Sequence, residues 1–373
     1  MAAIDSARPQ TLGRPLGAAA AARHAAIALL VAVPVAVVGY VFAHAGRHPT
    51  DFETFWQSGR ALLHGRSPYP SLGSLPSQPY QTFAPFVYPP VAAVSMIPFS
   101  GLPYGAAVVL FLAVDLTAIA LSLSLLGVRD WRCYSVAFMS APVFAGSAMG
   151  TISPLLLLGV AAAWRYRDKA VRLGLLVAYV VTAKVFLWPV VLWLIGTRRY
   201  RAAATAAAAS AVALLAAWGS IGFAGLGTYP RLLSRLTGLE GPKSYSLYSL
   251  GRAFGLGSTL AQIVVYLVGA VAIVMVARRV HDSGRLLIAA IGVSLLLTPI
   301  LWPHYLVLLF VPLALARPRL SPIWIAPMAI WLDATAWSDG NRARIAVLLA
   351  ITGATLFAAA RLVGPRPEGL DSV

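Results

Sequence analysis

The sequence predicts an all-α protein that crosses a membrane many times. Hydrophobic residues make up 59% of the 373-residue chain and charged residues only 11%, whereas a soluble domain carries about 25% charged residues. Long apolar runs alternate with short clusters of Lys and Arg. Several of these runs contain a Pro or Gly near the middle, where a helix would break. These observations exclude a water-soluble globular fold.

The net charge of +17 does not indicate binding to nucleic acid. The basic residues lie in short clusters between apolar runs, which is typical of the cytoplasmic loops of membrane proteins. A nucleic-acid-binding domain would gather them on one face. The single cysteine, Cys133, excludes an internal disulfide and a Cys-based metal site.

Six apolar runs are long enough for one membrane crossing each, which takes about 20 residues. They are residues 25–44, 103–126, 202–224, 258–277, 321–338 and 342–360. The first run follows basic residues, like a signal peptide, but no small-residue cleavage site comes after it. We therefore expect the first run to be a retained span.

Three other apolar regions have basic clusters at both ends. They are residues 133–164, 173–196 and 286–316. The positive-inside rule favours the cytoplasm for both ends of each region. Each region also carries helix breakers near its middle, namely Pro142 and Gly150, Lys184 and Pro189, and Pro299 and Pro303. We predict that each is a pair of short helices meeting at an outward-facing tip.

This arrangement gives about twelve membrane segments in a domain of residues 25–360. Residues 1–24 and 361–373 are the predicted cytoplasmic tails. Of the 29 Lys and Arg residues, it places 19 inside and 10 outside, as the positive-inside rule requires. The two long outer loops are then residues 45–90 and 225–257.

A helix is predicted at the start of the first outer loop. Thr50-Asp51-Phe52-Glu53 has the spacing of a capping box. Phe and Leu residues then recur at helical spacing, and Gly65 can end the helix. We predict that this helix lies in the interface of the outer leaflet.

Asp51 is the most informative polar residue of that helix. An acid in a first turn can simply complement the helix dipole. It can also act as a general base at the membrane surface. Glu53 fits a capping role better, because positions two apart on a helix do not share a face. The outer side has no Asp-x-Asp pair or His/Glu cluster, so we predict neither a metal site nor a cofactor.

Two basic groups interrupt apolar segments. Lys184 lies in Val-Val-Thr-Ala-Lys-Val-Phe-Leu-Trp, where an ionisable residue is expensive and functional by default. Alternatively, Lys184 lies at a helix tip and its ammonium reaches the membrane surface while its methylene stem stays buried. His304 lies in Trp302-Pro303-His304-Tyr305 at a proline-broken tip. It is either a hydrogen-bonded structural residue or a ligand of a phosphate or hydroxyl group.

The remaining candidates are weaker. Tyr88, in Phe-Val-Tyr-Pro-Pro, is either an aromatic of the membrane interface or a residue that stacks on a sugar. Arg252 is either a charge at the rim of the second outer loop or a phosphate ligand. We expect Asp115 to find a partner within the membrane domain. Neither it nor Asp333 or Asp339 receives a functional role.

The order of five motifs along the chain resembles one protein family. They are Asp51 after the first span, Leu-His-Gly-Arg-Ser-Pro-Tyr at 63–69, Phe-Val-Tyr-Pro-Pro at 86–90, Ala-Lys-Val-Phe-Leu-Trp-Pro at 183–189, and Leu-Thr-Pro-Ile-Leu-Trp-Pro-His-Tyr at 297–305. This set, spread over roughly residues 50–310, resembles glycosyltransferase family 87. That family comprises the polyprenyl-phosphate-mannose-dependent α-mannosyltransferases of actinobacterial envelopes, which have the GT-C fold.

The resemblance implies a GT-C-type bundle and an inverting sugar transfer. It makes Asp51 the catalytic base and places Lys184 and His304 near a lipid phosphate. Arg252, Tyr88 and Trp302 complete the predicted substrate-binding residues. The expected partners are a polyprenyl-phosphate-linked sugar donor, an envelope glycolipid or glycan acceptor, and membrane lipid. The expected location is the cell membrane, with the active site on the extracytoplasmic side.

Two motifs depart from the family pattern. Gly150-Thr151 stands where the family often has Gly-Gln, and Ser244-Tyr245-Ser246-Leu247 stands at an Asn-Gln-Ser-type element. The sequence therefore leaves open the acceptor and the choice between mannose and arabinose. The competing hypothesis is a transporter or lipid flippase, which broken helices and a buried lysine would also suit. The absence of internal repetition argues against it.

Overall fold

The regular secondary structure in the described part of the chain consists of helices. The computed structural model describes residues 18–44, 50–70, 85–333 and 338–363. The helices within these residues are α1 Ala18–His44, α2 Thr50–Leu63, α3 Pro90–Ser100, α4 Tyr104–Leu125, α5 Trp131–Met139, α6 Ala141–Met149, α7 Ser153–Arg165, α8 Ala170–Ala183, η2 Val185–Leu187, α9 Val190–Gly196, α10 Tyr200–Gly219, η3 Leu226–Thr228, α11 Tyr229–Glu240, η4 Gly241–Lys243, α12 Leu247–Ala253, α13 Ser258–Arg279, α14 Ser283–Leu297, η5 Pro303–Leu309, α15 Phe310–Ala316, η6 Pro322–Ile325, α16 Ala326–Ala329, η7 Ile330–Asp333 and α17 Arg342–Leu362. Most of both predicted tails and part of the first predicted outer loop lie outside the described residues.

Five of these helices are long and apolar enough to cross a membrane. They are the Ala22–His44 part of α1 together with α4, α10, α13 and α17. Each coincides with one of the six predicted single spans, so the prediction of a helical membrane protein is confirmed. The remaining predicted span, 321–338, is only partly described and is not among these five helices, so this crossing stays a prediction. Over its described residues this region is η6, α16 and η7 in direct succession, because Pro327 lacks the backbone N–H that a regular α-helix needs at that position.

The three regions with predicted breaks are all interrupted. The first consists of α5, α6 and α7, separated at Ser140 and at Gly150, whose φ is +65°. The second consists of α8, η2 and α9, with the break at Lys184. The third consists of α14, then a non-helical stretch before Pro303, then η5 and α15. A helix of 13 residues such as α7 spans only about 20 Å, less than a bilayer core. The count of about twelve segments stays a prediction.

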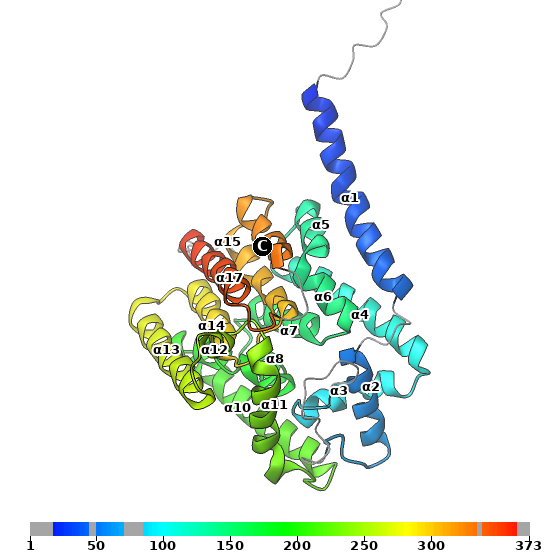
Figure 1. Cartoon of the computed structure of the whole chain (residues 1–373), viewed down its shortest axis with the longest axis vertical. Helices are drawn as coiled ribbons and strands as arrows, with labels where there is room; N and C mark the ends of the chain where they lie inside the picture. The colour runs from blue at the N-terminus through cyan, green and yellow to red at the C-terminus, as the bar shows by residue number, and fades with distance from the viewer. Residues whose placement is uncertain (1–17, 45–49, 71–84, 334–337, 364–373) are drawn as a thin grey trace, which may run out of the picture.

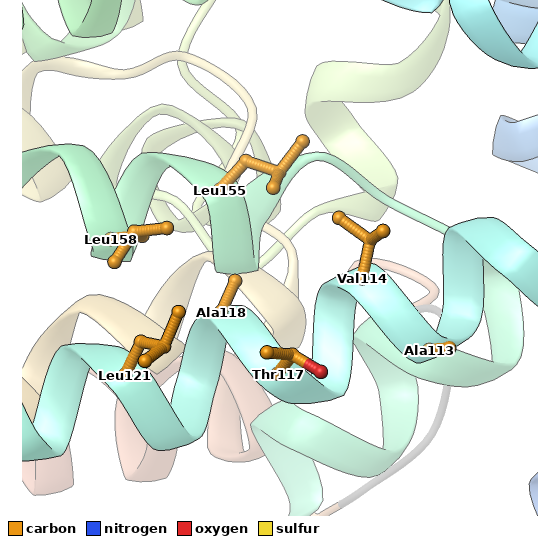
Figure 2. A pocket seen from close by; sticks show the side chains of 7 residues that line it. All are labelled: Ala113, Val114, Thr117, Ala118, Leu121, Leu155 and Leu158. Atoms are coloured by element: carbon orange, nitrogen blue, oxygen red, sulfur yellow. The ribbon is translucent and has the colours of Figure 1, made fainter.

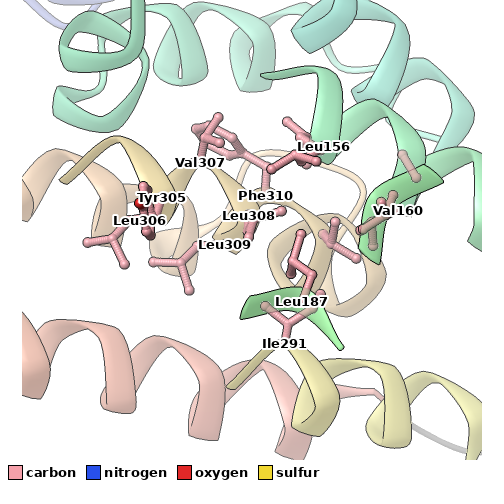
Figure 3. Packing of buried hydrophobic residues seen from close by; sticks show 14 of the residues in the cluster. Leu156, Val160, Leu187, Ile291, Tyr305, Leu306, Val307, Leu308, Leu309 and Phe310 are labelled. Carbon is pink, nitrogen blue, oxygen red and sulfur yellow. The ribbon is translucent and has the colours of Figure 1, made fainter. Parts of the chain in front are cut away.

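The larger apolar core includes most of η5. Residues Leu306 to Phe310 are fully buried. They pack with Leu156 and Val160 of α7, Leu187 of η2 and Ile291 of α14, as Figure 3 shows. The two other broken regions thus meet at η5, which brings their non-helical tips to the same part of the molecule.

Helix α2 is confirmed at its predicted position. Phe52, Phe55 and Gly59 form its buried face, which packs on α3. Gly59 is needed there, because a Cβ would collide with the Ser100 hydroxyl, which binds the Trp56 carbonyl. The predicted apolar face therefore contacts protein, and the contact of α2 with lipid stays a prediction.

Helix α1 extends away from the rest of the structure (Figure 1). It packs mainly against α5 and α6, and few of its side chains are buried. Lipid is the natural solvent for such an apolar, exposed helix.

Candidate active site

Asp51 lies in the first turn of α2. Its neighbour Phe52 anchors the turn, because its fully buried ring stacks on Phe111 of α4 at a centroid distance of 4.6 Å. Gly150, at the end of α6, packs directly on Phe52, where a Cβ would approach that of Phe52 to 2.5 Å. The position of Asp51 is thus fixed by contacts with α4 and α6.

The surroundings of Asp51 disfavour its ionised form. The residue keeps some contact with solvent, yet protein atoms enclose it on most sides. This burial raises the pKa of Asp51 to about 6, while the positive charge of Lys184 acts in the opposite direction. A carboxylate that ionises near pH 6 is suited to take a proton at neutral pH.

Lys184 lies at the break between α8 and η2. Its backbone is extended, with φ −150° and ψ 104°, so its side chain leaves the helical direction of α8. Only 6% of the residue is exposed, and within the described residues its ammonium has no hydrogen-bond partner. The ammonium instead lies near three aromatic rings, at 3.8 Å from the centroid of Tyr305, 5.2 Å from Tyr88 and 5.9 Å from Phe186.

These rings offset only part of the cost of burying the charge. A desolvated cation–π contact contributes about 2 kcal/mol. An ammonium without hydrogen bonds in a low-dielectric site loses considerably more solvation than that. The site of Lys184 therefore favours an anion that can accept its three N–H groups.

His304 is the second residue of η5 and is 1% exposed. Neither ring nitrogen has a hydrogen-bond partner among the residues that the structure describes. Its Cβ lies 3.5 Å from where a Cβ of Gly146 would stand, so α6 packs against it. Polar ring atoms that are buried without partners normally indicate a missing ligand or water.

Asp51, Lys184 and His304 lie close together, and we refer to them as the Asp51 cluster. The charge of Lys184 acts on both Asp51 and His304. The charge of Asp51 acts in turn on Tyr88 and on Tyr305. Three segments that are more than a hundred residues apart in sequence thus supply one acid and two nitrogen groups. Tyr88, also predicted from the sequence, borders this cluster.

Arg252 is not part of the Asp51 cluster. Its guanidinium binds the Leu256 carbonyl at 3.0 Å, in the turn between α12 and α13. No interaction in the described part of the chain joins it to Asp51, Lys184 or His304. Trp302 precedes η5 and packs, half-buried, against the main core. Its contact with substrate stays a prediction, as does that of Arg252.

Tyr305 and Phe186 border the Asp51 cluster but were not predicted. Their rings stack on each other at 5.0 Å and both face Lys184. Each is adjacent or nearly adjacent to a predicted residue, His304 or Lys184. The sequence signal was therefore present, but spacing alone does not show that the two rings meet around one ammonium.

The three acids without a predicted role are not in the cluster. Asp333 pairs with Arg344 of α17 at 2.5 Å. Asp115 is fully buried in α4, and neither of its oxygens accepts a hydrogen bond from any residue in the described ranges. The expected partner of Asp115 is therefore missing there. Asp339 adopts a positive φ of 50° in a turn before α17.

The chain also matches a known protein family. The model of glycosyltransferase family 87 matches residues 86–299, which is more than half of the chain. The match includes Tyr88 and Lys184, whereas Asp51 and His304 flank it and are brought in by the fold. Searches among curated proteins and among solved structures give no match. The chain belongs to glycosyltransferase family 87, and it is a glycosyltransferase of the membrane.

Proposed function

We propose that the protein transfers mannose from a polyprenyl-phosphate donor to a glycolipid or glycan of the cell envelope. Membership of family 87 supports the sugar transfer. The apolar helices support a donor that is carried by a lipid. The distribution of basic residues between the apolar runs supports an active site on the extracytoplasmic side.

The observation that carries this proposal is the pair of buried, unpartnered nitrogen groups next to an acid. Among the described residues, the Lys184 ammonium and the His304 imidazole lack hydrogen-bond partners. A lipid phosphate would accept hydrogen bonds from both and would neutralise the buried charge of Lys184. Both groups are held in place by packing before the donor arrives. They would therefore stabilise the charge that develops on the leaving phosphate without reorganising.

Asp51 acts as the general base in this proposal. Its carboxylate takes the proton of an acceptor hydroxyl while the hydroxyl oxygen bonds to the anomeric carbon. The bond from that carbon to the phosphate oxygen breaks on the opposite face, and polyprenyl phosphate leaves with the electron pair. Such a displacement inverts the configuration, so a β-linked donor gives an α-mannoside. Positioned base catalysis contributes about 10²–10⁴-fold to the rate.

Tyr88 has two roles in the proposal. Its ring lies 5.2 Å from the Lys184 ammonium and 4.8 Å from the ring of Phe55 in α2. It therefore lies beside both Lys184 and α2, the helix that carries Asp51, and in this proposal the transferred sugar lies against it. An aromatic ring in that place can both support the cation and contact the apolar face of the sugar.

The test is sugar transfer by an Asp51→Asn variant, with Glu53→Gln as the matched control. Membranes or purified protein receive labelled polyprenyl-phosphate mannose and a mixture of envelope acceptors. Asp51→Asn should lower the rate of transfer about 10²–10⁴-fold. Glu53 accepts a hydrogen bond from Gln57, and its conversion to Gln should leave transfer within a few fold. Equal rates for Asp51→Asn and wild type would remove Asp51 from the role of base.

A further inference from the structure

An apolar cavity of about 240 Å³ lies between α1, α2, α4 and α6. Its lining includes Tyr40 and His44 of α1, Phe52 of α2, Phe111 of α4, and Ser147 and Ala148 of α6. Apart from the serine and the histidine these side chains are apolar or aromatic. The cavity is therefore suited to a hydrocarbon chain that carries few polar atoms.

The cavity adjoins the Asp51 cluster through two shared elements. Phe52 forms part of its wall, while the preceding residue, Asp51, belongs to the cluster. On α6, Gly146 packs against His304, while the next residue, Ser147, lines the cavity. A molecule that fills the cavity would therefore end within reach of the first turn of α2.

The cavity opens at the protein surface between α1 and α6. Tyr40 is 54% exposed on α1, and Ala148 is exposed at the end of α6. Deeper inside, Ser147 is 5% exposed and its hydroxyl has no hydrogen-bond partner among the described residues. At the rim, one nitrogen of His44 binds the Tyr40 carbonyl at 2.8 Å. These two polar groups can bind the few oxygen atoms of a lipid-linked molecule.

We propose that this cavity holds the apolar chain of a lipid-linked acceptor. The inference rests on the proposed function, in which attacking and leaving groups stand on opposite faces of the anomeric carbon. The donor phosphate belongs beside Lys184 and His304, and the acceptor hydroxyl belongs beside Asp51. Phe52, which adjoins Asp51, lines the cavity directly, whereas neither His304 nor Lys184 lines it, and we therefore assign the cavity to the acceptor. A dry cavity of about 150 Å³ holds a benzene molecule, so 240 Å³ holds about ten carbon atoms.

The experiment uses a photoreactive alkyl mannoside with a diazirine in its chain. The purified full-length protein is irradiated with this probe, and the labelled peptide is identified by mass spectrometry. Label is expected on α1 or α6. Ala148→Phe fills the entrance from α6, and Val41→Phe fills the same cavity from α1. Each should lower labelling about tenfold or more, because the phenyl ring displaces at least two methylene groups of the probe from the cavity, and burying two methylene groups contributes about a factor of ten to binding.

The matched control is Ala113→Phe. Ala113 lines an apolar pocket of the same volume whose lining residues all belong to α4 and α7 (Figure 2). The substitution adds the same side chain to a different apolar pocket and should leave labelling on α1 and α6 unchanged. Equal loss in Ala113→Phe and Ala148→Phe would overturn the proposal.

Competition and transfer separate the possible failures. Excess unlabelled alkyl mannoside should abolish labelling, whereas polyprenyl phosphate should leave it within twofold. Protection by polyprenyl phosphate would assign the cavity to the donor chain and overturn the proposal. Asp51→Asn should keep the labelling. If wild type and Asp51→Asn label equally and transfer equally, the proposed base has failed while the cavity still binds a lipid chain.

Discussion

Replacing Lys184 by Met should move the acid limb of the pH–rate profile to higher pH. The proposed base works only when it is ionised, and the pKa of Asp51 is about 6 because burial raises it and Lys184 opposes that rise. Wild-type transfer should therefore fall about tenfold per pH unit below pH 6. Without the lysine charge the pKa of Asp51 rises further. An opposite charge at close range shifts a carboxyl pKa by about 1–3 units.

The size of this effect follows from the fraction of ionised Asp51. At pH 6 about half of the wild-type carboxyl is ionised. A pKa near 7 would leave about one tenth of the carboxyl ionised. At pH 6, the rate of Lys184→Met as a fraction of its own plateau rate should therefore be about five times smaller than the same fraction for wild type. The plateau itself should also drop, because the phosphate loses a cation, but the position of the limb is independent of the plateau.

The assay is kcat/KM for transfer from labelled polyprenyl-phosphate mannose, measured between pH 5 and pH 9. Lys184→Arg is the matched control, since it retains the charge and should keep the limb near pH 6. An acid limb that stays at pH 6 in Lys184→Met, or that moves to lower pH, would refute the electrostatic link between Lys184 and Asp51.

Three further outcomes are expected. Tyr305→Leu should raise the KM for the donor about 2–30-fold through loss of the ring nearest Lys184, whereas Tyr305→Phe should stay near wild type in the same donor titration. Gly150→Ala should lower stability by about 1–3 kcal/mol and reduce kcat, because its Cβ collides with Phe52. The control is Gly127→Ala, whose φ of +84° is similar but whose Cβ would meet open space; it should lose less stability in thermal denaturation. Transfer should persist in EDTA, since the Lys184 ammonium and the His304 imidazole are proposed to bind the phosphate without a metal; loss of activity that Mg²⁺ restores would contradict this.

The sequence allowed most helices to be predicted because their signals are local. Apolar length, basic clusters and proline positions mark the five long helices and the interruptions at Gly150, Lys184 and Pro303. Over its described residues the predicted span 321–338 alternates between 3₁₀ and α-helix, as η6, α16 and η7. Hydrophobicity predicts entry into the membrane, but it does not show whether the backbone within it stays continuous.

The candidate site was only partly predictable, for a physical reason. Asp51, Lys184 and His304 each stand out as a polar group within or beside an apolar segment. Tyr305 and Phe186 look like ordinary core aromatics in the sequence. Their role as neighbours of the ammonium depends on the approach of η5 to the break after α8, which is a tertiary contact. Arg252 is the opposite case. Its charge and its position in a loop suggested that it binds substrate, but in the structure its side chain binds the local backbone.

The most direct test of the central claim is an experimental structure of the protein with polyprenyl phosphate bound. The phosphate should lie within hydrogen-bond distance of both the Lys184 ammonium and the His304 ring. The Asp51 carboxylate should face it across a space about the size of one sugar. A phosphate bound elsewhere in the membrane domain, with Lys184 and His304 still unpartnered, would contradict the account.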